Sequence, residues 1–255
     1  DSLTVSPKTP GTKSTKEEAV CCDDRSLLCE EVSFKSGRGR KKNSAAAAAT
    51  EPREAKVNGT QGNEVVFQGD RREADYADLP GQWDRIWINE GSKNNSINYA
   101  IIKNNFIGIQ ASVLTNPNDP RNLKVTNTIV KNCSKWGFYT QFFNIWSANN
   151  VFCNCKEYCG AFTLGGNYTF LHTTFGNYFS QDGGRGGQPC VHIDNYDGTD
   201  TWPCDSIYIA NSILQGSQGN EFEYDLRPSS FSPSPKYEIS HSLLRTAAIT
   251  GTVIT

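Results

Sequence analysis

Short patterns of polar and apolar positions repeat along the chain from residue 98 onward. Residues 126–132 read TNTIVKN and residues 148–154 read ANNVFCN; both have a polar start, two adjacent β-prone residues, a variable residue and a closing Asn. Four further segments follow this pattern, with Gly or Thr replacing the closing Asn in the last two. The six segments are 98–104, 126–132, 148–154, 171–177, 210–216 and 240–246. Such repetition indicates a fold built by stacking one structural unit on the next.

The spacing of these segments sets the size of the unit. Successive segments start 28, 22, 23, 39 and 30 residues apart. The two shortest intervals fix a basic repeat of 22 or 23 residues, and the longer ones carry insertions. Each segment is too short for a helical repeat and is rich in Ile, Val, Phe and Thr, which favours a strand. A second short strand is predicted after most segments, at residues 107–110, 137–140, 160–164 and 220–224.

A coil with two or three short strands cannot bury its own apolar side. It becomes stable when coils stack, with about 4.8 Å between equivalent residues of neighbouring coils. Leucine-rich repeats require more Leu at fixed spacing, and propeller blades require about 40 residues each. The pattern therefore predicts an all-β fold, a right-handed parallel β-helix.

Equivalent positions of successive coils are expected to form columns along such a stack. Asn side chains in a column hydrogen-bond through their amides, which explains the recurrence of Asn at the ends of strands. His172 and His241 share a column with Asn residues and are expected to extend this polar ladder rather than to catalyse a reaction. That column is Tyr99, Asn127, Asn149, His172, Asn211 and His241. A second column, expected to face outward, is Lys103, Lys131, Cys153, Gly176, Gln215 and Arg245.

The bulk composition narrows the class of protein. Of 255 residues, 36% are hydrophobic, which is low for a globular protein, but the 11% of aromatic residues argues against disorder beyond residue 55. The 25 basic and 27 acidic residues nearly balance, so no nucleic-acid partner is expected. No apolar run approaches the length of a transmembrane helix. Membrane association is therefore expected only through a lipid anchor or a partner.

Residues 1–54 differ in character from the rest. They contain the basic run GRGRKKN and five consecutive alanines at 45–49, with neither strand alternation nor a helical stripe. We interpret residues 1–54 as an irregular N-terminal segment, either a cap or a tail. Residues 55–255 are predicted to form the β-helix, with an insertion loop at 180–205.

Nine cysteines are present, and most fall in two places. Cys133, Cys153, Cys155 and Cys159 crowd one region, and Cys190 and Cys204 flank a loop. Metal ligation is one interpretation, but no His lies near the first group in sequence. Buried small apolar residues are the favoured one, with Cys190–Cys204 as the best disulfide candidate.

The insertion loop holds the strongest candidate site. Asp194, Asp197 and Asp200 recur at three-residue intervals around a Gly turn, and oxygen ligands so spaced make a candidate Ca²⁺ site; no other cofactor is indicated. Other residues in the loop suit a carbohydrate or protein partner, because aromatic rings stack on sugars and polar groups bond to hydroxyls. These residues are Arg185, His192, Asp194, Tyr196 and Trp202. The alternative is a cap whose aromatic residues pack over the flank of the helix.

Two tryptophans lie in a second candidate region, DYADLPGQWDRIW. Trp87 lies between Ile86 and Ile88 and is expected in the core, although strict alternation would point it outward. Trp83 is expected to cover an edge or to contact a partner.

Several phrases between about residues 56 and 245 also resemble a known family. These are VNGTQGNEVVFQGDR, PGQWDRIWINEGSKNNSINYAIIKNNFIGIQ, NYTFLHTTFGNYF and IYIANSILQGSQGNEFEY. They are similar to cell-envelope proteins of Bacteroidota that contain a right-handed, pectin-lyase-like β-helix. The resemblance implies export to the cell surface, the outer membrane or the extracellular space, but it implies no reaction.

Catalysis is not indicated by the repeat region. Pectin hydrolases of this fold place several Asp on adjacent coils, and lyases cluster Asp or Glu around Ca²⁺ beside an Arg or Lys base. The six segments offer no such cluster. The expected function is therefore a non-catalytic, surface-exposed scaffold or partner subunit of a cell-envelope assembly. The alternatives are a carbohydrate-binding module and a polysaccharide lyase or glycoside hydrolase, so the expected partners are envelope proteins or a surface polysaccharide.

Overall fold

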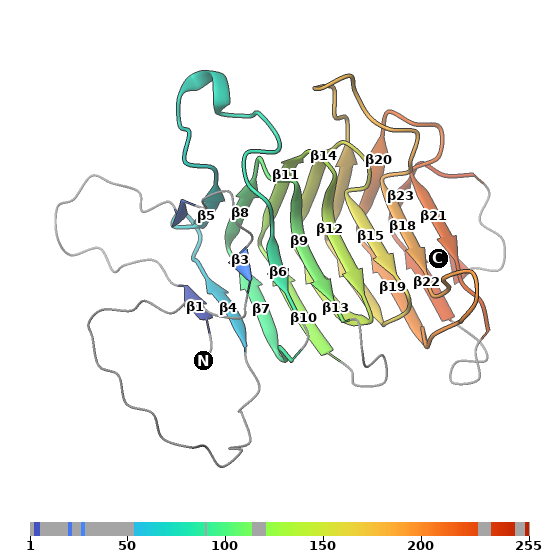
Figure 1. The fold of residues 1–255 in the computed structure, drawn as a ribbon. Coiled ribbons are helices and arrows are strands. Elements are labelled where there is room, and N and C mark those ends of the chain that lie inside the picture. The colour runs from blue at the N-terminus through green and yellow to red at the C-terminus, as the bar shows by residue number, and fades with distance from the viewer. Residues whose placement is uncertain are drawn as a thin grey trace, which may run out of the picture.

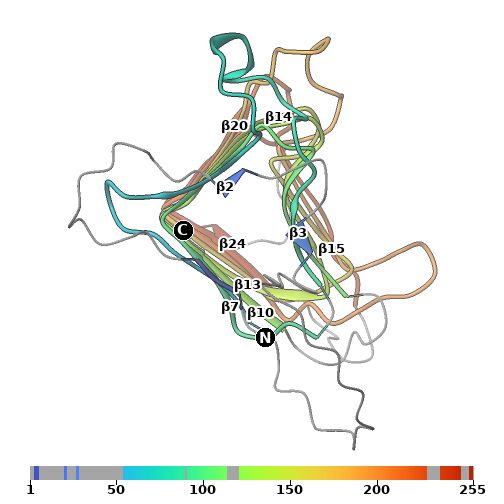
Figure 2. The same ribbon diagram turned by 60° about the vertical axis from the view of Figure 1, so that its left-hand side comes forward.

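The structure, a computed structural model, describes residues 3–5, 20–21, 27–28, 54–89, 91–113, 121–228, 236–247 and 253–254. These residues form strands and loops with one 3₁₀ turn, η1 (Ala74–Tyr76), and none of them lies in a helix that could cross a membrane. Three parallel sheets run along the molecule, and every third strand joins the same sheet. Viewed along the stack, the sheets enclose a triangular interior (Figure 2). The fold is a parallel β-helix, which confirms the predicted solenoid architecture.

Each coil contributes at most one strand to each sheet (Figure 1). Sheet A contains β1 (Leu3–Val5), β4 (Ala55–Asn58), β7 (Asn95–Asn98), β10 (Arg121–Thr126), β13 (Phe143–Ala148), β16 (Tyr168–Leu171), β19 (Ser206–Ala210), β22 (Lys236–Ser240) and β24 (Val253–Ile254). Sheet B contains β2 (Val20–Cys21), β5 (Val65–Gln68), β8 (Ala100–Lys103), β11 (Ile129–Cys133), β14 (Val151–Cys155), β17 (Thr174–Asn177), β20 (Ile213–Gly216) and β23 (Leu243–Leu244). Sheet C contains β3 (Leu27–Leu28), β6 (Ile86–Ile88), β9 (Ile107–Ser112), β12 (Trp136–Gln141), β15 (Gly160–Thr163), β18 (Val191–Asp194) and β21 (Phe222–Asp225).

The strand register reproduces the intervals found in the sequence. Hydrogen bonds between equivalent positions of sheets A and B join residues 28, 22, 23, 39 and 30 apart. Three strands of the N-terminal segment also belong to the stack: β1, β2 and β3 pair with β4, β5 and β6. The basic run and the alanines of that segment lie outside the described residues.

The six repeated segments are corners rather than single strands. Each begins in sheet A and ends in sheet B, and its second residue has a positive φ, as at Asn127 (51°), Asn149 (58°) and His172 (48°). Asn tolerates this left-handed conformation better than most residues, which explains its recurrence there. The prediction of seven-residue strands was therefore wrong, because one left-handed residue turns the chain from one sheet into the next.

The outer side of this corner carries part of the predicted Asn ladder. Asn149 Nδ2 donates to Asn127 Oδ1 at 2.7 Å, and Asn127 Nδ2 donates to Asn98 Oδ1 at 2.9 Å. His172 and His241 are exposed in the same column. Their side chains form no hydrogen bond with another described residue, so the ladder does not extend to them.

A second polar ladder, which the sequence reading missed, lies buried in the adjacent column. The Thr128 N–H donates to Asn150 Oδ1 at 2.8 Å, and the Ser212 N–H donates to Ser242 Oγ at 3.1 Å. The hydroxyl groups then donate to a carbonyl two residues earlier, as Ser212 Oγ does to Ala210 O at 2.8 Å. Backbone groups that the corner removes from the sheets are satisfied in this way. The ladder consists of Thr128, Asn150, Thr173, Ser212 and Ser242.

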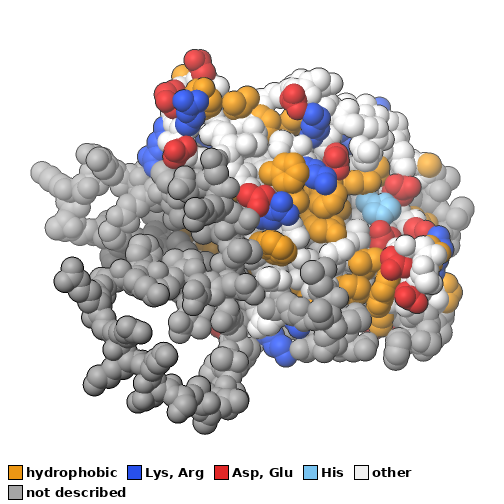
Figure 3. All heavy atoms as spheres, in the orientation of Figure 1, with side chains coloured by type: hydrophobic (Ala, Val, Ile, Leu, Met, Phe, Trp, Pro, Cys, Tyr) orange, Lys and Arg blue, Asp and Glu red, His pale blue; other side chains and the backbone are white. Residues whose placement is uncertain are grey.

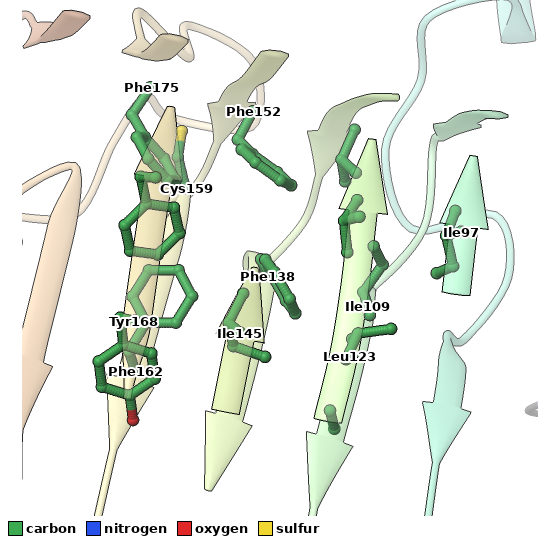
Figure 4. Close-up of a cluster of buried hydrophobic side chains, with 14 of the residues drawn as sticks. Ile97, Ile109, Leu123, Phe138, Ile145, Phe152, Cys159, Phe162, Tyr168 and Phe175 are labelled. Atoms are coloured by element: carbon green, nitrogen blue, oxygen red, sulfur yellow. The ribbon is translucent and has the colours of Figure 1, made fainter. Parts of the chain in front are cut away.

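Apolar side chains from all three sheets fill the interior, and its middle coils are rich in aromatic rings (Figure 4). Phe152 stacks on Phe138 and Phe175, with ring centroids 5.5 and 5.0 Å apart. Phe162 meets both Phe138 and Phe175 edge-on. Such pairs add stabilisation beyond their buried area.

Six cysteines of the β-helix are free thiols: Cys133, Cys153, Cys155, Cys159, Cys190 and Cys204. Five of them are fully buried, as the sequence predicts: Cys133, Cys155, Cys159, Cys190 and Cys204. The predicted Cys190–Cys204 disulfide is not formed, because Cys190 contacts Cys159 instead.

Candidate functional site

The loops of the β-helix are concentrated on both sides of sheet C. From β7 onward, the corner between sheets A and B is only one or two residues long, as at Tyr99 or residues 127–128. By contrast, residues 69–85 and 178–190 connect sheet B to sheet C, and residues 195–205 lead from sheet C to sheet A. Figure 2 shows these loops projecting from the two corners that border sheet C. Because function usually lies on loops held by a rigid scaffold, the outer face of sheet C is the candidate site.

The two loops at the corner between sheets B and C contact each other and the coils below. Asp78 lies at the centre of these contacts: it accepts from Asn132 Nδ2 at 3.1 Å, and its carbonyl accepts from Gln181 Nε2 at 3.0 Å. Asn104 Nδ2 donates to the neighbouring Ala77 O at 2.9 Å. Residues 69–85 and 178–190 therefore form one continuous wall along this edge of sheet C.

A buried ion pair anchors residues 178–190. Arg185 Nη1 and Nη2 donate to the two carboxylate oxygens of Glu221 at 2.6 and 2.9 Å, and the two side chains are only 2% and 0% exposed. Arg185 also donates to the carbonyls of Asn177 and Gln188. Arg185 is predicted to bind a carbohydrate or partner, but the structure buries its guanidinium in contacts that hold the loop to the next coil.

The three predicted calcium ligands do not converge. Asp197 accepts the N–H groups of Thr199 and Asp200 at 2.9 and 2.8 Å, which closes a local turn and holds the pKa of Asp197 below its ordinary value. The Asp194 carboxylate contacts His192 and the Leu164 N–H. Among the described residues no group of His, Cys, Asp or Glu side chains could hold a metal ion.

The aromatic residues of the 195–205 loop pack on their neighbours. Trp202 meets Phe142 edge-on with ring centroids 5.2 Å apart. The Arg227 guanidinium lies over the Tyr196 ring, 3.5 Å from its centroid. This packing is what the cap alternative predicts, and it places both rings at the margin of sheet C rather than on its face.

Trp83 and Trp87 have exchanged the roles expected of them. Trp83 is buried, with 3% of its surface exposed, and its indole N–H donates to Lys103 O at 2.8 Å. Trp87 points outward from β6 and donates to Ser112 Oγ at 3.1 Å. Strict strand alternation, which points Trp87 away from Ile86 and Ile88, was the correct signal.

Trp87 begins a column of outward side chains that crosses sheet C. Register pairs Trp87 with Gln110, Gln110 with Tyr139, and Ala161 with His192. The full column is Trp87, Gln110, Tyr139, Ala161, His192 and Glu223. Figure 3 shows this face, with hydrophobic and basic side chains gathered near its centre and acidic ones gathered around a histidine to the right.

Aromatic and basic side chains make up one end of the face. The Lys135 ammonium lies 4.3 Å from the centroid of the Trp136 ring and 5.7 Å from that of Phe106. The Arg85 guanidinium lies 5.6 Å from the Phe106 centroid and 5.8 Å from that of Trp87. These contacts hold the rings and the cations together at the surface.

The Trp136 ring also contacts the centre of the face. Its centroid lies 4.4 Å from that of Tyr139, and its indole N–H donates to Glu157 Oε2 at 2.6 Å. Both aromatic rings are half-buried, so each keeps part of its surface open to a ligand. Sequence reasoning missed Trp136 and Tyr139, although both lie in or next to a predicted strand.

Charged side chains around His192 make up the other end. His192 Nε2 lies 2.9 Å from Asp194 Oδ2, and Nδ1 lies 3.4 Å from Glu223 Oε2. Burial alone would lower the pKa of His192, but the hydrogen bond to Asp194 and the charges of Asp194 and Glu223 outweigh it, so the pKa lies above the ordinary value. Asp225 and Tyr158 also face this imidazole. The arrangement favours the protonated form of His192, which lies between carboxylates.

Protonated His192 is expected to stabilise the fold at low pH. A pKa raised on folding gives stabilisation that is fully present below the unfolded pKa, about 6.5, and is lost as the pH rises through the folded value. The difference in Tm between the wild type and His192→Gln should therefore be largest below about pH 6.5 and should shrink as the pH increases. Thermal unfolding followed by circular dichroism across this range measures the difference. A difference that grows with pH would contradict the proposed charge state.

Compared with known proteins, the chain matches no family model, no curated protein and no solved structure.

Proposed function

We propose that this protein binds an extended carbohydrate chain along the outer face of sheet C and does not cleave it. The observation that carries the proposal is the group of partly exposed aromatic rings on three successive coils, which lies beside polar side chains and between two sets of loops: Trp87, Phe106, Trp136 and Tyr139. Aromatic rings supply flat apolar surfaces for sugar rings, and the polar groups around them supply hydrogen bonds to hydroxyls. The ligand is expected to lie parallel to the stack, crossing β6, β9, β12, β15 and β18.

The state of His192 supports binding rather than catalysis. A general base must reach the proton that it removes with an unoccupied atom. Both ring nitrogens of His192 face carboxylates, and Asp194 Oδ1 also accepts the Leu164 N–H at 2.9 Å. Nε2 is engaged by Asp194, and Nδ1 has only the longer contact with Glu223, an arrangement that suits a binding surface.

Removing single rings from the face should weaken binding. Trp87→Ala and Trp136→Ala are each expected to reduce affinity about 10-fold, because each removes one stacking surface of roughly 1–2 kcal/mol. Affinity electrophoresis in gels containing soluble neutral and acidic polysaccharides identifies the ligand, and titration calorimetry then measures the change. Trp146→Ala is the matched control, since Trp146 is 39% exposed on sheet A and lies under Lys124.

Three results would contradict the proposal. One is the absence of retardation of the wild type by every polysaccharide in the panel. Another is an equal loss of affinity in Trp146→Ala, which would move the site away from sheet C. The third is release of reducing or unsaturated ends from the bound polysaccharide, which would show that the face is catalytic.

The resemblance to envelope proteins of Bacteroidota supports a location outside the cell membrane for this binding face. A surface polysaccharide is then the partner that the face suits best. That the protein is a partner subunit of an envelope assembly stays a prediction, which rests on the same resemblance.

A further inference from the structure

Four buried thiols form a row at the corner between sheets B and C. Cys133 and Cys155 are in register on β11 and β14, and the Cys159 N–H donates to Cys190 O at 2.8 Å. None of the four has exposed surface. The row therefore runs through three successive coils inside the protein.

Each thiol in the row contacts the next. The Cys155 thiol is close enough to those of Cys133 and Cys159, and the Cys159 thiol to that of Cys190, for neighbours to influence one another's pKa. The hydrogen bonds that two of these thiols donate go elsewhere, from Cys133 Sγ to Asn105 Oδ1 at 3.0 Å and from Cys155 Sγ to Cys153 O at 3.6 Å. Cys153 is only partly buried on the outward side of β14, and its neighbours in register are Lys131 and Gly176.

Neighbouring coils hold the paired cysteines at a suitable separation for disulfides. Stacked residues are about 4.8 Å apart at Cα, inside the range of about 4.4–6.8 Å that disulfides adopt. Two bonds, Cys133–Cys155 and Cys159–Cys190, would use all four thiols, and each bond would join successive coils. Pairing the middle thiols, Cys155 and Cys159, would leave Cys133 and Cys190 without partners.

We propose that this row is an oxidation site in which Cys133–Cys155 and Cys159–Cys190 disulfides form when the chain folds in the presence of a disulfide oxidant. For each bond, one cysteine thiolate attacks the oxidant disulfide, forms a mixed disulfide and releases one thiol. The second cysteine thiolate then attacks the cysteine sulfur of that mixed disulfide and releases the second thiol. The cysteine pair loses two electrons to the oxidant, and the two thiol protons pass to the released thiols.

The exchange must take place before the coils close. Burial raises the pKa of the Cys155, Cys159 and Cys190 thiols well above the ordinary value, so these three thiols are almost entirely un-ionised in the folded protein. A chain folded under reducing conditions should consequently keep its thiols, as in the structure described here.

Refolding the reduced full chain in oxidised and reduced glutathione tests the proposal. Remaining thiols are alkylated in guanidinium, and tryptic peptides are analysed by mass spectrometry without reduction. Cleavage after Lys135, Lys156 and Arg185 places Cys133, Cys155, Cys159 and Cys190 in four different peptides. We expect residues 132–135 linked to 136–156, and residues 157–185 linked to 186–236, because trypsin does not cleave between Arg227 and Pro228. The oxidised protein should also have a Tm several degrees above that of the reduced protein, because each bond restricts the unfolded chain.

Variants separate the proposed pairs from their neighbours. Cys153→Ser and Cys204→Ser should keep both links, whereas Cys155→Ser should lose the first and keep the second. Complete alkylation of the four thiols after oxidative folding would overturn the proposal. A Cys155–Cys159 or Cys190–Cys204 link would overturn it as well.

Discussion

Replacing Glu221 by Gln is expected to lower the free energy of unfolding by about 3–5 kcal/mol, because it leaves the Arg185 guanidinium buried without its counter-charge. Both side chains are almost fully buried, so water cannot take the place of the lost carboxylate oxygen. Glu221 Oε1 also accepts the Gln218 N–H at 2.6 Å, and this contact holds the start of β21. Chemical denaturation followed by circular dichroism measures the loss.

A second ion pair on the same sheet provides the control. Asp225 contacts Arg227 at 2.7 Å, but the two side chains are 50% and 44% exposed. Asp225→Asn should therefore leave the denaturation midpoint nearly unchanged, since solvent screens an exposed pair. A similar midpoint for both variants would show that burial of Arg185 and Glu221 does not set the strength of their interaction.

Loss of the Arg185–Glu221 ion pair should disturb the proposed binding face as well as lower the stability of the fold. Arg185 and Glu221 hold residues 178–190, which contact Asp78 through Gln181 and so complete the wall beside sheet C. A loop released from this anchor would also free the chain that leads into β18, which carries His192. The ion pair thus supports the proposed site without contributing an atom to it.

The architecture could be predicted from the sequence because stacked coils repeat their burial pattern. The pairs Val130–Phe152 and Phe152–Phe175 are in register, as the aligned segments require, and the intervals of 22 and 23 residues recur as hydrogen-bonded neighbours. Each coil adds its own copy of the pattern, so one irregular coil does not obscure the period.

The site could be predicted only in part, because its residues come from different coils. Asp194 and His192 were recognised, but as members of an insertion loop, whereas β18 places them on the same face as Tyr139 and Trp87. The sequence suggests a surface position for Arg185, because its partner Glu221 lies 36 residues away. Charge and aromatic content in a loop do not show which side chains the next coil will bury.

The buried polar ladder is a second case in which the sequence did not show which side chains are buried. Ser, Thr or Asn occupies the position before the strand of sheet B in successive coils, directly after the left-handed residue. Both columns are polar, so the sequence alone did not show which one turns inward. The structure places Asn150 inside and Asn149 outside, because the left-handed residue points its side chain away from the corner.

Asn150→Ala is accordingly expected to destabilise the fold by about 2–6 kcal/mol, since two buried backbone groups lose their partners at roughly 1–3 kcal/mol each. The Asn150 amide accepts the Thr128 N–H at 2.8 Å and donates to Val125 O at 2.7 Å, and the side chain is 1% exposed. These bonds join two coils at a corner where neither sheet supplies a partner. Urea denaturation monitored by tryptophan fluorescence measures the change.

Asn149→Gly is the matched control for this prediction. Asn149 is exposed and has a φ of 58°, a conformation that Gly adopts without strain, so the substitution should change stability by less than about 1 kcal/mol. Asn149 and Asn150, although adjacent in one repeat, would then differ several-fold in their contribution to the free energy of unfolding. If the two variants unfold at the same urea concentration, the inner ladder does not hold the coils together, and the corner depends on its apolar neighbours alone.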